Sequence, residues 1–281
     1  MTPKAAPGVL SESYWNDAGG DVWVEHQALL DRINQPVGDI VAERADPGPG
    51  ARVLDVGCGA GATTLDMARR VGPEGLSTGV DVSGALVELG RRRARAAGVA
   101  NVDFVRADAG THAFGEAAFE AAISRYGVMF FEDPDAAFAN LRRAVRPGGG
   151  LTFACWRGAA ENPLSLVPLE AAAPFLPEPP RIPADGPGRF AFADPDRVRG
   201  VLDRSGWRRV EIEPLDVATP VSFDELMILS LRLGLLSTIL PGQDEAVRRR
   251  IAEAVAVRLE GHVEDGMVPM TAACWLVTAV A

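Results

Sequence analysis

The chain has 281 residues, of which 47% are apolar, so it is long enough to bury a sizeable hydrophobic core. Its 28 basic and 38 acidic residues give a net charge of −10 at pH 7. Because a surplus of acid repels polyphosphate, we expect no nucleic-acid partner. The three cysteines are too few and too far apart for a disulfide framework or a C-x-x-C metal site, and they fit a reducing, cytoplasmic location.

The first 46 residues predict a helical N-terminal extension. Apolar residues recur there at roughly helical spacing, and the segment ends in the breaker ADPGPG. The start of the chain shows no apolar stretch typical of a secretory signal.

Residues 47–157 alternate between short apolar runs and helical patterns. Strands are predicted at RVLDVG, LSTGVDV, NVDFVRAD, AAISRYGV and GLTFACW, with helices between most of them. Strands joined by helices of this length imply right-handed crossovers and a parallel sheet. The predicted class is therefore doubly wound α/β.

The alternation stops at the proline-rich residues 158–193, which we interpret as a substrate insertion made of a loop and a short helix over the sheet. Residues 194–281 are expected to complete the same domain, with a helical insertion at 221–262 and a terminal strand TAACWLVTAV. The apolar run at 226–240 is interpreted as a buried or lid helix. It is shorter than the ~20 residues that cross a bilayer, so we expect no membrane span. These extra helices could form a lid, a homodimer surface or both.

The stretch VLDVGCGAGATT at 53–64 predicts a strand, a tight loop and the start of a helix. Gly57 and Gly59 leave room for backbone to approach a ligand around Cys58, and Gly61 lets the next helix pack closely. Asp55, just before the loop, could accept hydrogen bonds from it. In a parallel sheet, ligands bind at the carboxyl ends of the strands, so this loop is the first candidate site.

Two acids follow the next strands along the chain. Asp81 could accept hydrogen bonds from both hydroxyls of a ribose, with Val82 packing on an adenine. Its alternative role is a helix N-cap, for which Ser83 is the better candidate. Asp108 could accept from an adenine amine, while the backbone N–H of Ala109 donates to the ring.

Three further side chains are candidates near the same crevice. Arg125 and Tyr126 leave the fourth predicted strand toward it, or they are simply exposed. His112 is the histidine nearest to the crevice and the candidate general base, although a loop histidine without a catalytic role fits equally well. Tyr126 could orient a substrate. The histidines show no metal-ligand spacing, so we predict no metal.

The glycine loop leaves two cofactors open. Gly57, Gly59 and Ala62 satisfy G-x-G-x-x-A. Asp81 lies at the sequence spacing expected of the acid that binds the ribose of a nicotinamide cofactor, so an oxidoreductase stays an alternative. The acid before the loop, the acid after the third strand and the turn RPGGGL favour a different nucleotide.

Together, the motifs LDVGCGAG, GVDVS, RADA, SRYGVMFFEDPDAAFANLRRAVRPGGGL and ACWLVTA resemble those of class I S-adenosylmethionine-dependent methyltransferases. The similarity is strongest to small-molecule enzymes of the ubiquinone and menaquinone biosynthesis type, and it is strong over about residues 50–157. It implies a Rossmann-like seven-stranded sheet with an antiparallel last strand, helices on both faces and an added helical lid.

The resemblance also implies S-adenosylmethionine as the cofactor and S-adenosylhomocysteine as the product. By position, the methionine part would lie near the loop from Gly57 to Gly61, the ribose near Asp81 and the adenine near Asp108. The family's N-terminal segment often closes over the cofactor, and YWNDAGGDVW looks like that element. Candidates for its closing wall are Tyr14, Trp15 and Trp23, unless they are aromatic core contacts.

We therefore expect methyl transfer to a small, apolar or aromatic acceptor by in-line displacement, driven by positioning and exclusion of water. The sequence does not identify the acceptor, nor whether oxygen, nitrogen, sulfur or carbon is methylated. A nicotinamide-dependent oxidoreductase and a non-catalytic, cofactor-binding partner subunit stay open as alternatives.

Overall fold

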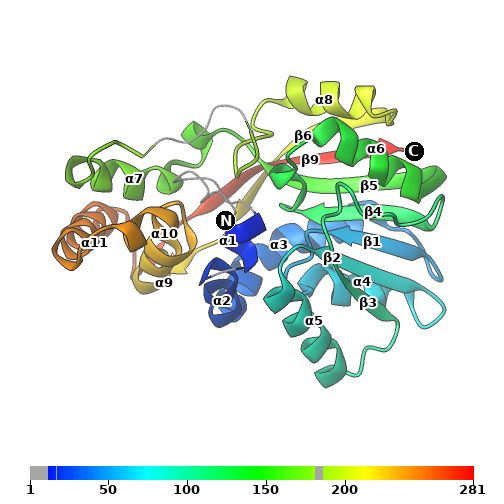
Figure 1. The fold of residues 1–281 in the computed structure, drawn as a ribbon, viewed down its shortest axis with the longest axis horizontal. Coiled ribbons are helices and arrows are strands. Elements are labelled where there is room, and N and C mark those ends of the chain that lie inside the picture. The colour runs from blue at the N-terminus through cyan, green and yellow to red at the C-terminus, as the bar shows by residue number, and fades with distance from the viewer. Residues whose placement is uncertain (1–11, 17, 181–185) are drawn as a thin grey trace.

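The computed structural model describes residues 12–16, 18–180 and 186–281. The start of the predicted N-terminal extension, and residues 181–185 within the predicted substrate insertion, lie outside this described part. A sheet flanked by helices occupies one side of the molecule and a group of helices the other, with the N-terminal helices between them (Figure 1).

The main sheet has seven strands in the order β3-β2-β1-β4-β5-β9-β6. β9 is antiparallel to both of its neighbours, whereas the other pairs in the sheet are parallel. The predicted methyltransferase-type sheet is thereby confirmed. Its strands are β1 (Arg52–Val56), β2 (Leu76–Asp81), β3 (Val102–Arg106), β4 (Phe119–Arg125), β5 (Val145–Trp156), β6 (Arg208–Ala218) and β9 (Thr271–Val280).

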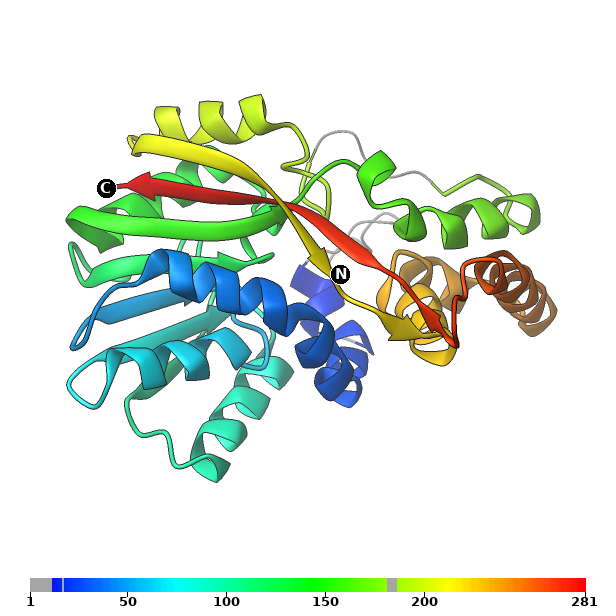
Figure 2. The same cartoon turned by 180° about the vertical axis from the view of Figure 1, so that it is seen from behind.

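Helices cover both faces of this sheet. Side chains alternate along β1, so that Val53 packs with α3 on one face while Leu54 and Val56 pack with α6 and α8 on the other. α3 is seen lying across its face from behind (Figure 2). The helices on the two faces are α3 (Gln27–Ala45), α4 (Ala62–Val71), α5 (Gly84–Ala96), α6 (Pro134–Ala144) and α8 (Pro195–Arg204).

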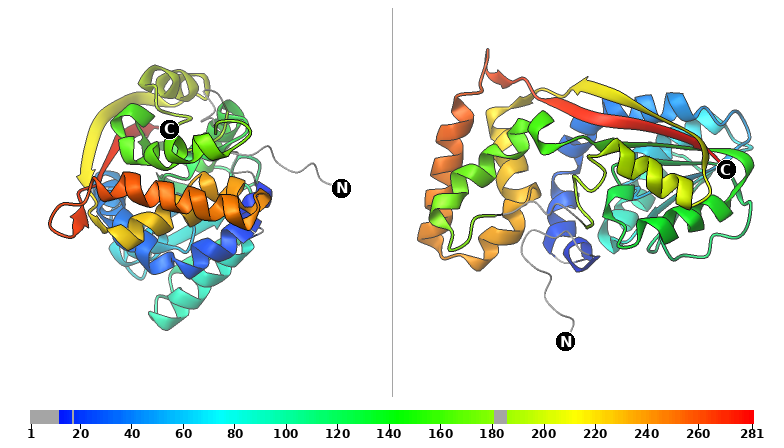
Figure 3. Two further views of the ribbon diagram at one scale, coloured as in Figure 1. Left: turned by 90° about the vertical axis from the view of Figure 1, so that its left-hand side faces the viewer. Right: turned by 90° about the horizontal axis from the view of Figure 1, so that it is seen from above.

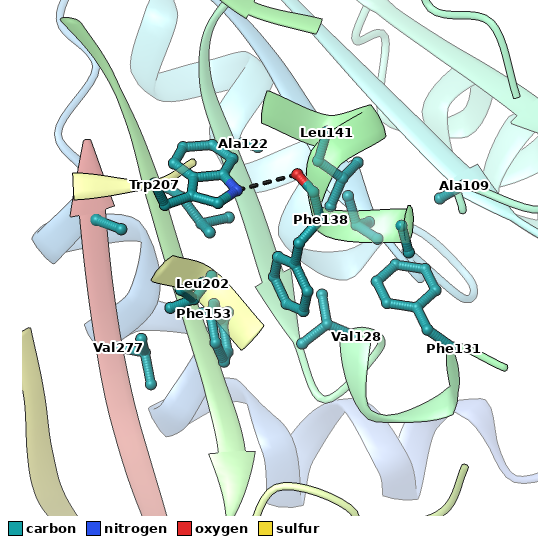
Figure 4. Close-up of a cluster of buried hydrophobic side chains, with 14 of the residues drawn as sticks. Ala109, Ala122, Val128, Phe131, Phe138, Leu141, Phe153, Leu202, Trp207 and Val277 are labelled. Carbon is teal, nitrogen blue, oxygen red and sulfur yellow. Dashed lines mark hydrogen bonds between the residues drawn. The ribbon is translucent and has the colours of Figure 1, made fainter. Parts of the chain in front are cut away.

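The larger hydrophobic cluster lies under α6 and α8 (Figure 4). Phe138, Phe153 and Leu202 are fully buried there. The indole Nε1 of Trp207 donates a hydrogen bond of 3.0 Å to the carbonyl oxygen of Phe138, which satisfies the one polar atom of the indole. This cluster fixes the positions of β5 and α6. The carboxyl end of β5 and the segment between β4 and α6 both lead to the candidate site.

Local capping explains where several helices begin. The side chain of Ser83 accepts from the backbone of Leu86 at the start of α5. Asp133 and Asp194 cap α6 and α8 in the same way, and each is followed by proline at the first helical position. All three caps come shortly after a strand or loop at the same end of the sheet.

A second group of elements forms a lid beside the sheet (Figure 3). It has its own buried cluster, which includes Leu169, Leu226, Leu236, Ile251 and Val255. Its elements are α7 (Val167–Ala172), β7 (Val221–Ser222), α9 (Phe223–Ile228), the π-helical turn η5 (Leu229–Leu233), α10 (Leu236–Ile239), α11 (Glu245–Glu260) and β8 (Met267–Val268).

The lid differs from expectation in two respects. α7, expected over the sheet, packs instead against α11, because its apolar residues Leu169 and Ala172 belong to the lid cluster. The apolar run at 226–240 is not one helix: a π-helical turn interrupts it, and Gly234 takes an extended conformation between η5 and α10. No helix in the described ranges is long and apolar enough to cross a membrane.

The N-terminal helices connect the lid to the sheet. They are α1 (Glu12–Asn16), α2 (Ala18–Glu25) and α3. The two terminal guanidinium nitrogens of Arg232 in η5 donate to the carboxylate of Glu25, at 2.9 and 2.7 Å. The hydroxyl of Tyr14 lies 3.1 Å from that of Ser237 in α10. The lid is thus held against the segment that the sequence predicted to close the site.

Candidate functional site

A cavity of about 450 Å³ lies between the carboxyl ends of β1, β2 and β4, the N-terminal helices and the lid. Its volume is within the range of small-molecule sites, roughly 300–1,000 Å³. Among the predicted site residues, those that line it are Trp15, Trp23, Gly57, Cys58, Gly59, Asp81, Val82, Asp108, Ala109, Arg125 and Tyr126. Tyr14, Asp55, Gly61 and His112 do not line it.

The glycine loop turns sharply after β1. Gly57, Gly59 and Gly61 all have positive φ, at 67°, 53° and 79°. A Cβ on Gly57 would come within 2.5 Å of the Cα of Gly127, so the two backbones touch. The amides of Gly57 and Cys58 both donate to the carbonyl of Val80, which ties the loop to β2. The loop therefore presents backbone rather than side chains to the cavity.

Asp55 lies beneath the loop, fully buried. Its Oδ2 accepts hydrogen bonds from the hydroxyls of Thr63 and Thr64 in the first turn of α4, at 2.5 and 2.6 Å. Burial raises the pKa of this carboxyl group, and the two hydroxyl donors oppose the rise. Gly61 begins the same helix and lies against the ring of Phe104. Both residues therefore shape the loop from behind.

The carboxylate of Asp81 is fixed by backbone on both sides. Its Oδ2 accepts from the amide of Gly59 at 2.8 Å, and its Oδ1 accepts from the amide of Ser83 at 2.9 Å. Burial raises the pKa of Asp81, while these two bonds lower it. Each carboxylate oxygen has a second lone pair, so the group can still accept hydrogen bonds from a ligand in the cavity.

Asp108 and Ala109 line the cavity at the end of β3. The carboxylate of Asp108 is exposed, and it accepts from the amide of Gly110 at 2.8 Å and from the hydroxyl of Thr111 at 3.1 Å. The ring of His112 packs edge-on against Phe114, with centroids 4.8 Å apart. Both carboxylate oxygens of Asp108 are thus bound by its own loop at the edge of the cavity, whereas His112 lies beside an aromatic neighbour.

Aromatic rings from the N-terminal segment cover one side of the cavity. Trp15 contacts Trp23 and Phe130 edge to face, with centroids 5.0 and 5.7 Å apart. The indole Nε1 of Trp23 is buried without a hydrogen-bond partner. Tyr14 packs behind Trp15, with centroids 5.1 Å apart, and reaches the lid.

Arg125 and Tyr126 follow β4 into the cavity. One guanidinium nitrogen of Arg125, Nη1, is buried without a hydrogen-bond partner. Burial lowers the pKa of Arg125, and the nearby Asp31 and Asp55 oppose this. The ring of Tyr126 stacks on Trp156, with centroids 4.7 Å apart, and its hydroxyl lies 3.3 Å from the Sγ of Cys274. Burial raises the pKa of Tyr126 well above its ordinary value.

The residues missed by the sequence reasoning come from two places. Gln27, Asp31 and Asn34 line the cavity from one face of α3, and their spacing of three to four residues along an amphipathic helix was a usable signal. Arg189 lines it from the segment that follows the proline-rich stretch, where no periodicity pointed inward. Among the described residues, no group of three or more His, Cys, Asp or Glu could hold a metal ion.

Residues 53–149 match a family described as a methyltransferase domain. Aklanonic acid methyltransferase DauC of a Streptomyces species (strain C5) is 32% identical over 118 residues, which are 42% of this chain and 54% of that protein. Demethylmenaquinone methyltransferase of Corynebacterium kroppenstedtii is 27% identical over 176 residues, covering 60% and 72% of the two chains. The chain spans about half the length of the first curated relatives it matches.

The fold has solved counterparts. Phosphoethanolamine N-methyltransferase 2 of Haemonchus contortus, in complex with S-adenosyl-L-methionine, superposes with a TM-score of 0.54 at 16% identity. The similarity covers 87% of this chain and 52% of that one. It extends the likeness from the domain at 53–149 to most of the chain at the level of fold.

Proposed function

We propose that this chain transfers a methyl group from S-adenosylmethionine to a small, largely apolar molecule, because residues 53–149 match a methyltransferase domain and the chain is similar to named methyltransferases. The observation that carries the proposal is the position of the Asp81 carboxylate, which lines the cavity and is tied to the glycine loop through Gly59. The similarities favour this function over a nicotinamide-dependent oxidoreductase.

The charges of the cavity fit the cofactor. Asp31, Asp81, Asp108 and Glu132 line it, and acidic surroundings stabilise a sulfonium cation rather than a polyphosphate. The unpartnered Nη1 of Arg125 supplies a buried donor for an amino-acid carboxylate. The carboxylate would thereby satisfy a nitrogen that is otherwise costly to bury.

We assign the remaining cofactor contacts by position. Backbone from Gly57 to Gly59, including Cys58, would hold the methionine part, and Asp81 would accept from the ribose hydroxyls. Val82 would pack on the adenine, Asp108 would accept from its amine, and the Ala109 amide would donate to its ring. In support, each of these residues lines the cavity.

The other predicted residues would act indirectly. Trp15 and Trp23 would close the cavity from the N-terminal side, because both line it. Tyr14 would hold that wall to the lid through Ser237. Asp55 and Gly61 would keep the loop and the start of α4 in shape, since both lie behind the cavity.

The cofactor supplies a methyl group activated on a positively charged sulfur. The protein's part is then to align the acceptor with that carbon in an in-line displacement and to exclude water, which can account for most of the rate. Tyr126 would orient the acceptor as a hydrogen-bond donor, because its raised pKa keeps it protonated. His112 remains a candidate base only for an acceptor that extends beyond the residues lining the cavity.

Calorimetric titration with S-adenosylmethionine and S-adenosylhomocysteine tests the cofactor assignment. Asp81→Asn should weaken binding by about 1–3 kcal/mol, since it removes a charged acceptor. That loss is about fivefold to 150-fold in the dissociation constant. Asp203→Asn is the matched control, because Asp203 is exposed on α8, away from the cavity. An unchanged affinity in Asp81→Asn, or stabilisation by nicotinamide cofactors instead, would refute the assignment.

Release of homocysteine from the product, measured with candidate acceptors, tests transfer itself. Cofactor binding without transfer to any acceptor would favour a non-catalytic, cofactor-binding subunit. We further propose that the partner is a small molecule and not nucleic acid, which the net charge of −10 supports. Formation of a homodimer stays a prediction for light scattering.

A further inference from the structure

The charged residues of the cavity are unevenly distributed. Its four acids come from α3, from the end of β2 and from the loops after β3 and η1 (Val128–Phe130), where we place the cofactor. A second part of the described lining is here called the acceptor half. It consists of Tyr126, Trp156 at the end of β5, the segments 164–169 and 186–191, Thr219 and the lid residues. The acceptor half contains no acid and a single cation, Arg189.

Arg189 has no counter-ion among the residues that the structure describes. Its Nη1 donates to the hydroxyl of Ser165 at 3.1 Å, and its guanidinium lies 4.5 Å from the ring centroid of Trp156. The titratable groups that act on it are Tyr126 and Cys274, and no described carboxylate is among them. The Arg189 side chain is exposed at the edge of the cavity, so an anionic ligand in the cavity can reach its guanidinium. A guanidinium binds a carboxylate or another anionic oxygen through charge-assisted hydrogen bonds.

The rest of the acceptor half is apolar. Leucines from α7, α9 and α10 face it, and the indole of Trp156 with the stacked ring of Tyr126 forms one wall. Apart from Arg189, its side-chain donors are uncharged: they include the hydroxyls of Tyr126, Ser165 and Thr219 and the indole N–H of Trp156. A ligand with a flat or aliphatic body and one charged end matches this lining.

We infer that the acceptor half binds an apolar molecule as its monoanion, with a carboxylate, phenolate or enolate oxygen held by the guanidinium of Arg189. This inference rests on the proposed function and specifies the substrate class. It agrees with the absence of a carboxylate or histidine in the described acceptor half. If the anionic oxygen accepts the methyl group, its O–C bond forms as the S–C bond breaks. The products are a neutral ether or ester and a neutral thioether, and no proton has to be removed.

Three naphthalene probes test the charge preference directly. Binding of 2-naphthoate, 2-naphthol and the neutral 2-naphthamide is measured by calorimetry at pH 7.5, with S-adenosylhomocysteine saturating the cofactor half. We expect 2-naphthoate to bind about tenfold to a hundredfold more tightly than 2-naphthamide, the range for a charge-assisted hydrogen bond. Tighter binding of 2-naphthol as the pH rises toward its own pKa would identify phenolate as the favoured anion, and preference for 2-naphthoate alone would identify carboxylate.

Three variants locate the effect. Arg189→Gln should abolish the preference for 2-naphthoate while leaving the affinity for S-adenosylhomocysteine unchanged. Arg189→Lys should retain part of it, since the charge remains but the planar contact with Trp156 is lost. Arg92→Gln is the control, because Arg92 is exposed on α5 and outside the cavity lining.

Two results would overturn the inference: equal binding of 2-naphthoate and 2-naphthamide to the wild-type protein, or an undiminished preference in Arg189→Gln. Both are distinct from failure of the proposed function, in which S-adenosylhomocysteine itself would not bind. Thermal unfolding of Arg189→Gln checks its fold. It should match that of the wild type, since Arg189 makes one side-chain hydrogen bond and no ion pair among the described residues.

Discussion

The contact between Gly57 and Gly127 gives a prediction whose size follows from the structure. Replacing Gly57 by alanine places a Cβ 2.5 Å from the Cα of Gly127. Because the contact is with backbone, it cannot be relieved by moving a flexible side chain. The substitution also forces alanine into a φ of 67°. The left-handed conformation costs about 1–2 kcal/mol. Overpacking adds about 1–3 kcal/mol, so we expect a loss of roughly 2–5 kcal/mol in the free energy of unfolding.

Two other glycines separate these contributions. Gly59 and Gly48 also have positive φ, at 53° and 81°, but a Cβ on either would meet no atom within 4 Å. Alanine at these positions should lower the free energy of unfolding only by the cost of the left-handed conformation, about 1–2 kcal/mol. Thermal unfolding should then place Gly57→Ala below both, by about 2–4 °C per kcal/mol of difference. Equal melting temperatures for the three variants would refute the close approach of the two backbones.

Two further predictions concern pH and packing. Burial raises the pKa of Asp81. As the pH is lowered, the affinity for S-adenosylhomocysteine should therefore begin to fall at a higher pH than it would with an aspartate of ordinary pKa. In Asp81→Asn this fall in affinity should be absent. Because the folded-state pKa lies above the unfolded value, protonating Asp81 favours the folded state, and circular dichroism at each pH should show no unfolding driven by this group. Trp207→Phe removes the donor to the carbonyl of Phe138 and should lower the free energy of unfolding by about 1–3 kcal/mol in urea titrations. An unchanged transition would contradict the role of that bond.

Much of the sheet was predictable because its signals are local. The strand, glycine loop and helix at 53–64 appear where expected, since positive φ at Gly57, Gly59 and Gly61 needs glycine whatever surrounds the loop. The position of Asp81 at the end of β2 follows from chain order in a parallel sheet, where strand ends meet at one edge. The caps at Ser83 and Asp133 are equally local.

The tertiary structure decided which surfaces face one another. Periodicity marks the apolar side of α7 but does not say whether it covers the sheet or α11. The break at Gly234 separates two short lid helices that the apolar run alone would merge.

The division of the cavity into an acidic half and a half with one cation also depends on tertiary contacts. Asp31 and Arg189 are 158 positions apart in the chain, and only the folding of the N-terminal helices and the lid around the strand ends brings both into one cavity. The sequence alone thus determined the glycine loop and the position of Asp81 beside it, because backbone conformation and chain order specify them. The acceptor half was decided by packing between distant segments, because each supplies only part of its wall.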